Sequence, residues 1–293
     1  MRRVVGDGFE GRRLLIGSIA LLVLLVVDVV LIAVAMDAHV APPSSTGSAA
    51  PTAPIESPGS SPTTSSSPTP TQASSAVTTR LLAAIDDSQA WRATIGACGQ
   101  PGEFEVTDDG GRTWTRAGLD VAGPVLALEP SSDGRRGIAV VGDDHCAPVA
   151  HRTFTAAVGW EEHPEQRVGS YTAPDGQLVL AGAPAPAPCD AASAVTAAGG
   201  GVVLCADEAL ARNNASDWVP IAEGVVAIGA ADQGVAVAVS GDASCDGLAV
   251  GLVVADALQV TCTAAPANAE VAVSAVGGQV WVWADDTVEI ENL

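Results

Sequence analysis

Short runs of alternating apolar and small residues recur along residues 80–293, separated by turns rich in Gly, Asp and Pro. No run keeps a helical period for ten residues, so the pattern predicts strands. The strands come in pairs. The first members are LLAAID at 81, VLALEP at 125, SAVTAA at 193, VVAIGA at 225 and EVAVSA at 270. The second members are AWRATIG at 90, GIAVVG at 137, GVVLCA at 201, GVAVAVS at 234 and QVWVWA at 279.

Strand pairs repeated at this spacing indicate an all-β domain, a β-propeller of five to six four-stranded blades over residues 80–293. Units of about 40–60 residues with four short strands are typical of propeller blades. Residues 165–188 fit no unit, so five blades, or six with one degenerate, are both open. The last unit ends after a third strand, TVEIENL. We expect residues 75–79, SAVTT, to supply its outer strand, because an unpaired sheet edge is a liability.

Residues 14–36 form an almost unbroken aliphatic run that predicts a transmembrane signal-anchor helix. At 1.5 Å per residue the run spans roughly 35 Å, more than a hydrocarbon core of about 30 Å. Asp28 interrupts it at an insertion cost of about 2.5–3.5 kcal/mol, which the surrounding Leu, Val and Ile side chains offset. We therefore expect the chain to be attached to the cytoplasmic membrane through this segment.

The flanks of this segment predict its orientation. Four Arg precede it within residues 1–13, and the next Arg is Arg80. The positive-inside rule places residues 1–13 in the cytoplasm and the rest outside the cell membrane, as a single-pass protein. A cleaved signal peptide competes with this interpretation, because Ala33-Val34-Ala35 resembles a cleavage site, but the length of the run favours an uncleaved anchor.

Residues 37–79 are rich in Pro, Ser and Thr and lack the large apolar side chains that offset the entropy of folding. We expect a disordered linker that reaches on the order of 100 Å when extended, enough to carry a domain through a cell wall.

All six Cys lie in residues 80–293, and none is in C-x-x-C spacing. In a chain placed outside the membrane, this indicates disulfides rather than metal ligands. Six Cys allow fifteen pairings, and the sequence alone does not choose among them. The simplest assignment pairs neighbours: Cys98 with Cys146, Cys189 with Cys205, and Cys245 with Cys262.

The formal net charge is −21, and the chain contains no Lys. So acidic a protein repels nucleic acid and anionic lipid, so we expect no nucleic-acid partner. Solubility is a sufficient explanation for the charge. The Ala-, Val- and Gly-rich composition suggests a bacterium of high GC content.

The stretch TDDGGRTW at 107 lies between the predicted third strand, EFEVTD, and the fourth, TWTRAG. Its residue types suit a hairpin turn: Asp109 can accept backbone hydrogen bonds, Gly110 and Gly111 can take positive φ, and Trp114 can fold under the turn. Two degenerate copies of this stretch occur at the same position in other predicted blades. TFTAAVGW at 153 keeps the first Thr and the Trp, and ARNNASDW at 211 has Asn213 in place of the Asp.

This stretch resembles the Asp-box, or bacterial neuraminidase repeat, S/T-x-D-x-G-x-T-W. The matching residues are Thr107, Asp109, Gly111, Thr113 and Trp114. The motif occurs in sialidases, in photosystem II assembly-factor-like propellers and in secreted actinobacterial proteins. The resemblance implies a propeller in which this turn is structural and lies on the rim, away from any catalytic centre.

We expect a non-catalytic binding or assembly module at the bacterial cell surface, because propeller loops converge at one end of a rigid scaffold. Its partner would be an envelope protein or a glycan. The alternative is a sialidase-like glycoside hydrolase, which in that family needs an Arg cluster, a Tyr nucleophile paired with Glu, and an acid/base residue. The only Tyr, Tyr171, lies in the irregular segment between predicted blades. Arg112 and Arg116 belong to the hairpin that contains residues 107–114, and Arg135 and Arg136 belong to a turn. We therefore expect no enzyme.

Smaller candidates favour structural roles. GDDHC, which ends at Cys146, and the nearby His151 hold potential metal ligands, but a solvated turn beside a disulfide is the preferred interpretation. Trp281 and Trp283 share one face of a strand and are expected to pack in the core. The sequon at Asn214 is expected to be silent in a bacterium. No phosphate-cradling loop is present, and we expect no cofactor and no metal.

Overall fold

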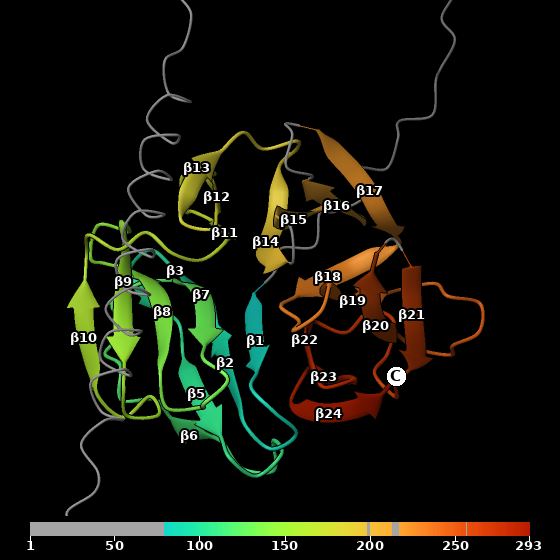
Figure 1. The fold of residues 1–293 in the computed structure, drawn as a ribbon, viewed down its shortest axis with the longest axis horizontal. Helices are drawn as coiled ribbons and strands as arrows, with labels where there is room; N and C mark the ends of the chain where they lie inside the picture. The colour runs from blue at the N-terminus through green and yellow to red at the C-terminus, as the bar shows by residue number, and fades with distance from the viewer. Residues whose placement is uncertain (1–78, 198–199, 213–216, 256) are drawn as a thin grey trace, which may run out of the picture. The chain divides into compact units, whose positions relative to one another are not determined.

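The computed structural model describes residues 79–197, 200–212, 217–255 and 257–293 (Figure 1). All of them belong to one of two compact units, Thr69–Leu293. The predicted cytoplasmic segment, transmembrane helix and linker fall outside the described residues, Thr79 excepted. Within the described part of the chain no helix is long and apolar enough to cross a membrane.

The domain is an all-β, six-bladed β-propeller, as the strand pattern predicts (Figure 1). Each blade is an antiparallel sheet, and the first strands of several blades contact one another across the centre, since β1 touches β7, β18 and β22. Blade 1 contains β1 (Arg80–Ala84), β2 (Ala90–Thr94), β5 (Phe104–Thr107) and β6 (Thr115–Arg116), with a hairpin of β3 (Gly96–Ala97) and β4 (Gln100–Pro101) after β2. Blade 2 contains β7 (Val125–Pro130), β8 (Gly137–Gly142), β9 (Pro148–Thr153) and β10 (Trp160–His163).

The remaining blades continue the series along the chain. Blade 3 contains β11 (Tyr171–Thr172), β12 (Leu178–Leu180) and β13 (Ala183–Ala185). Blade 4 contains β14 (Ala191–Ala197), β15 (Gly200–Cys205), β16 (Glu208–Arg212) and β17 (Trp218–Glu223). Blade 5 contains β18 (Val225–Gly229), β19 (Val235–Val239), β20 (Ala249–Val254) and β21 (Ala257–Cys262). Blade 6 contains β22 (Val271–Val276), β23 (Gln279–Ala284) and β24 (Thr287–Asn292).

Blade 3 decides between the two alternatives left open by the sequence, because residues 165–188 contain a sixth, degenerate blade. Its strands are only two or three residues long, too short for an alternating pattern to be visible. Tyr171 therefore lies in β11 and not in an irregular segment between blades. Among the described residues, blades 3 and 6 have three strands each, so the expectation of four strands per blade holds for the other four.

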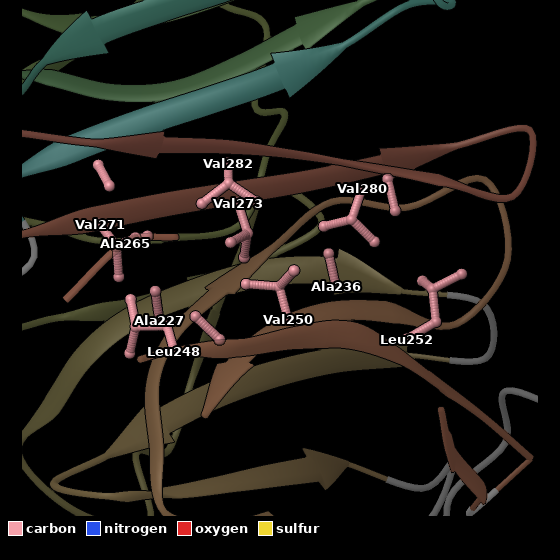
Figure 2. Close-up of a cluster of buried hydrophobic side chains, with 13 residues drawn as sticks. Ala227, Ala236, Leu248, Val250, Leu252, Ala265, Val271, Val273, Val280 and Val282 are labelled. Atoms are coloured by element: carbon pink, nitrogen blue, oxygen red, sulfur yellow. The ribbon is translucent and has the colours of Figure 1, made fainter. Parts of the chain in front are cut away.

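The hydrophobic core is divided among the seams between neighbouring blades. Successive side chains of a strand point to opposite faces of its sheet, so each blade packs against the blades on both sides. In β23, Val280 and Val282 face blade 5, where they meet Leu248 and Val250 (Figure 2). Burying a side chain of this size contributes about 1.5–3 kcal/mol. Strands such as β19 and β23 are buried on both faces, so their sequences are continuously apolar and do not alternate between apolar and polar residues.

The opposite face of β23 closes the ring between blades 6 and 1. Trp281 and Trp283 are buried there, which confirms their predicted place in the core. Trp281 Nε1 donates to the Asp86 carbonyl at 3.1 Å. The guanidinium of Arg92 lies over the rings of Trp114 and Trp283, at 4.1 and 4.8 Å from their centroids. Such cation–π contacts contribute roughly 0.5–1 kcal/mol or more, so side chains from both blades hold this seam together.

The predicted outer strand of blade 6, residues 75–79, falls almost wholly outside the described residues. Thr79 is described, and its carbonyl accepts a hydrogen bond from the Ile95 amide at 2.7 Å, just beyond the end of β2. The prediction is wrong for Thr79, because this residue extends the β1–β2 pairing of blade 1 and does not lie beside β24. For residues 75–78 it stays a prediction.

Candidate functional site

A narrow channel runs along the axis, where propellers commonly place their sites. It is lined mainly by Leu, Ala, Val and Ile from the first strands, and its cavity volume is about 80 Å³. Ligand pockets are typically about 300–1,000 Å³. This part of the channel is therefore smaller than a typical ligand pocket. A second cavity, at the ends of β1, β7, β18 and β22, has a volume of about 270 Å³.

Two charged residues reach this channel. The Arg80 guanidinium donates to Glu270 Oε2 at 3.2 Å and to the Asp285 carbonyl. These two hydrogen bonds direct the guanidinium toward blade 6. Burial raises the pKa of Glu129. Within the described residues, the channel holds this one Arg, and therefore not the Arg cluster that a sialidase-like site requires.

The turn at residues 107–114 joins β5 to β6 and is held by its own side chains. Asp109 Oδ1 accepts the Thr113 amide at 2.9 Å, and Oδ2 accepts the Thr113 hydroxyl at 2.7 Å. The Thr107 hydroxyl donates to Asp109 Oδ1 at 2.9 Å and accepts the Gly111 amide at 3.1 Å. These hydrogen bonds, those from Thr113 foremost, lower the pKa of Asp109 to about 2. Both oxygens of the Asp109 carboxylate thus accept hydrogen bonds from residues of the same turn.

The turn at residues 153–160 repeats this arrangement in blade 2. The Thr153 hydroxyl accepts the amides of Thr155 and Ala157, both at 3.2 Å. Thr155 takes the position of Asp109, and its hydroxyl accepts the Gly159 amide at 2.7 Å. Gly111 and Ala157 both have positive φ, 78° and 64°. The predicted second copy is therefore confirmed as a turn of the same geometry. Residues 213–216 of the third copy lie outside the described residues.

The three Trp that close these turns pack into seams between blades, and not within a single blade. Trp114 packs with residues of blade 6, and Trp218 packs with residues of blade 3. Trp160 makes edge-to-face contacts with Trp91 and Phe104 of blade 1, with centroids 5.7 and 5.6 Å apart. Each of these Trp side chains therefore packs against the preceding blade.

Three disulfides join the pairs expected from the sequence. Their Cα–Cα distances are 5.7 Å for Cys98–Cys146, 6.0 Å for Cys189–Cys205 and 5.4 Å for Cys245–Cys262. The first links the loops that follow the second strands of blades 1 and 2. The other two lie within blades 4 and 5. Disulfides persist in oxidising compartments, so they indicate an extracytoplasmic domain.

All three disulfides lie at the same end of the propeller. Adjacent strands are antiparallel, so the loops after the second and fourth strands gather where the first strands begin. We call this the stapled end and define it by loops 95–103, 143–147, 240–248 and 263–270, together with residues 186–190. The opposite end is made of the turns after the first and third strands, including residues 107–114 and 153–160.

The candidate metal ligands form a turn, as the preferred interpretation expects. Asp143 Oδ1 accepts the amides of His145 and Ala147, at 2.8 and 2.9 Å, and Cys146 is bonded to Cys98. His151 lies apart in β9, where burial lowers its pKa. No group of three or more His, Cys, Asp or Glu in the described part of the chain is arranged to hold a metal ion.

Two of the Arg side chains in turns, those of Arg112 and Arg136, form hydrogen bonds within their own turns. Arg112 Nε donates to the Asp109 carbonyl at 2.8 Å, and Arg136 Nε donates to Asp133 Oδ2 at 2.7 Å. Both lie at the end opposite to the stapled end, and Arg135 lies beside Arg136 in the same turn. Tyr171 lies on another part of the molecule, paired with Val179 in blade 3. The structure therefore does not bring these Arg together with the Tyr.

A cleft that the sequence did not predict lies between blades 2 and 3, and Tyr171 lines it. Its volume is about 570 Å³, within the range of ligand pockets. Polar groups on its wall include Gln166, Arg167, Asp175 and Gln177. The signal in the sequence was the segment 165–188, which lacks the apolar runs needed to fill a seam. We refer to this site as the seam cleft.

Comparisons with known proteins give similarity in fold only. No protein-family model and no curated protein matches the sequence. Among solved structures, a chain described as YCF48 bound to D1 peptide is 13% identical, with a TM-score of 0.40, over 74% of this chain and 79% of that one. The GH74 enzyme of Niastella koreensis is 15% identical, with a TM-score of 0.37, over 68% of this chain and 34% of the enzyme. The match thus spans about a third of that enzyme.

Proposed function

We propose that residues 80–293 form a non-catalytic binding module that contacts another component of the bacterial cell envelope through the stapled end. The observation that carries this proposal is the position of the disulfides, all of which fix loops at one end. Loops that are already ordered lose less conformational entropy on binding. Binding residues are also found most often on loops held by a rigid scaffold.

Residues 14–36 are proposed to anchor this module in the cytoplasmic membrane, with residues 37–79 as the linker. The support is the aliphatic run, the Arg that precede it, and disulfides that suit an extracytoplasmic compartment. The turns at residues 107–114 and 153–160 are proposed to be Asp-box turns. Their support is the shared hydrogen-bond geometry around Thr107 and Thr153.

The sialidase-like alternative has weaker support. A nucleophilic Tyr must lose its proton readily, whereas burial raises the pKa of Tyr171. One Arg, Arg167, lines the same cleft, where the resemblance implies a cluster. A fluorogenic sialoside assay at mildly acidic to neutral pH is expected to show no turnover. Turnover that disappears in Tyr171→Phe would restore the enzyme.

The binding proposal is tested by two triple variants with the same change in charge. One replaces exposed residues at or near the stapled end, Asp120, Asp144 and Asp246, by Lys. The other replaces exposed residues of the opposite end, Asp87, Asp108 and Asp217, by Lys. Each full-length variant is used to capture envelope components after mild cross-linking. The stapled-end variant should lose the partner that the wild type retains, and the opposite-end variant should keep it. Equal capture by both variants, or the reverse loss, would contradict the proposal.

A further inference from the structure

The seam between blades 2 and 3 is the least filled of the six. Its buried core consists of Leu126, Ala127 and Val140, with Val168 and Tyr171 packed against them. By contrast, the seam between blades 5 and 6 buries thirteen residues (Figure 2). The short strands of blade 3 explain the difference. In β12, Leu178 and Leu180 pack toward blade 4, and only Val179 remains to face blade 2.

The floor and the wall of the seam cleft differ in chemistry. Val140 and Ala150 from blade 2 and Val179 from blade 3 are buried and form an apolar floor. Tyr171, half-buried, adds one aromatic ring beside Val179. The wall carries two amides, one guanidinium and one carboxylate, from Gln166, Gln177, Arg167 and Asp175, and also the imidazole of His145 from the stapled-end loop 143–147.

These polar groups have unused hydrogen-bonding capacity. Gln166 Oε1 is buried and accepts no hydrogen bond from the described residues. Asp175 Oδ1 accepts the Gln177 amide at 3.0 Å, which leaves Oδ2 free within the described chain. The side chains of Arg167 and Gln177 make no hydrogen bond to any residue that the structure describes. Arg167, Asp175 and Gln177 are exposed, but the Oε1 atom of Gln166 is buried. Buried polar groups are normally satisfied, so this acceptor calls for a polar ligand group.

We propose that the seam cleft binds a short segment of a neutral oligosaccharide, a site that rests on the binding function proposed above. Sugar hydroxyls both donate and accept, which matches amides, a carboxylate and a guanidinium at once. The charges of Arg167 and Asp175 cancel, so a neutral ligand fits. The Tyr171 ring and the Val179 side chain offer an apolar surface for the C–H face of a sugar ring.

Two other ligand classes fit the cleft less well. An apolar molecule would cover the polar wall and leave its groups unpaired. A peptide binds through an open strand edge or through apolar side-chain pockets. The backbone of β12 is paired on both sides, with β11 and β13, and that of β9 with β8 and β10. The cleft therefore presents side chains and not a free edge.

The chain offers a spectroscopic probe at this position, because Tyr171 is its only Tyr. The full 293-residue chain, labelled with 3-fluorotyrosine and kept in a detergent without sugar, should give one ¹⁹F resonance. Neutral hexasaccharides of glucose, mannose and N-acetylglucosamine are titrated at millimolar concentrations, beside an anionic uronic-acid oligomer and a neutral peptide. At least one neutral sugar should shift the resonance saturably, and the anionic oligomer and the peptide should not.

Two variants separate recognition from folding. Gln177→Ala removes an exposed side chain and keeps the backbone hydrogen bonds of its turn, so it should weaken sugar binding about three- to tenfold. Gln166→Leu removes a buried acceptor that has no partner, so it should weaken binding without lowering Tm. The matched control, Gln259→Ala, alters an exposed Gln on blade 5 and should leave binding unchanged.

The possible outcomes distinguish a failure of the sugar site from a failure of the proposed binding function. A saturable shift that Gln177→Ala weakens and Gln259→Ala does not would support the sugar site. No shift with any neutral sugar, or a shift with the peptide or the anionic oligomer alone, would overturn it. Sugar binding detected by calorimetry without a ¹⁹F shift would also overturn it, because the ligand would then lie elsewhere. Capture of an envelope partner through the stapled end would stand in each of these cases.

Discussion

Asp109 and Thr155 occupy equivalent positions in two turns of the same geometry, but only Asp109 carries a charge. Hydrogen bonds from Thr113 and Thr107 stabilise the charged form, and the pKa of Asp109 falls from 3.8 to about 2. A carboxyl group whose pKa is lower in the folded state stabilises the fold above its unfolded pKa. This stabilisation is lost as the pH falls through the folded pKa.

The pair gives a prediction with an internal control. Asp109→Ala should lower Tm by a few degrees above about pH 4, and the difference from the wild type should shrink as the pH falls toward 2. Thr155→Ala removes an equivalent acceptor that does not titrate, so its effect on Tm should stay constant over the same range. Thermal unfolding between pH 6 and pH 2 measures both. A constant penalty for Asp109→Ala would show that the carboxylate charge has no part in stabilising the turn.

At the scale of elements, the disulfides differ in the length of chain that they close. Cys98–Cys146 spans 48 residues and joins two blades, whereas Cys245–Cys262 spans 17 within one blade. In the chain-entropy model these closures contribute about 4 and about 3 kcal/mol.

Replacing Cys98 and Cys146 together by Ala should therefore lower the free energy of unfolding more than replacing Cys245 and Cys262 by Ala. Denaturant unfolding of the two double variants checks this order. A larger loss for the Cys245–Cys262 pair would mean that native packing around each bridge, and not chain entropy, dominates.

Among the described residues, β24 pairs only with β23, and its other edge gives another prediction at this scale. Residues 75–78 are expected to pair with it, because an exposed six-residue edge invites aggregation. A chain beginning at Gln72 should melt higher and aggregate less than one beginning at Thr79. Starting at Thr79 keeps Arg80, so the Arg80–Glu270 contact is retained in both. Equal melting temperatures and equal solubility would count against the outer strand.

The strands that the sequence predicted well are those buried on both faces. Runs such as QVWVWA and GVAVAVS are long and apolar, so their positions follow from composition alone. β11, in contrast, has only two residues, too few to show an alternation of apolar and polar positions. The seam cleft could not be predicted from the sequence for a further reason. It arises from contacts that blade 3 does not make, and a single sequence records no contacts. The sequence did not determine the disulfide connectivity, but the simplest assignment, which pairs neighbouring Cys, matches the structure because propeller blades follow one another in chain order.

At the scale of the whole molecule, the two ends of the propeller differ in construction. The opposite end is made of short turns that satisfy their own hydrogen bonds, as around Asp109 and Thr153. The stapled end carries longer loops, fixed by disulfides at residues 98–146, 189–205 and 245–262. This asymmetry is the basis for assigning binding to one end, outside the membrane.

Site-specific photo-crosslinking in intact cells tests this assignment most directly. A photoreactive side chain is placed at Asp144 on the stapled end or at Asp108 on the opposite end, both of which are exposed. We expect a discrete crosslinked species from position 144, formed outside the cytoplasm, and none from position 108. A crosslink from position 108 with none from 144 would contradict this assignment.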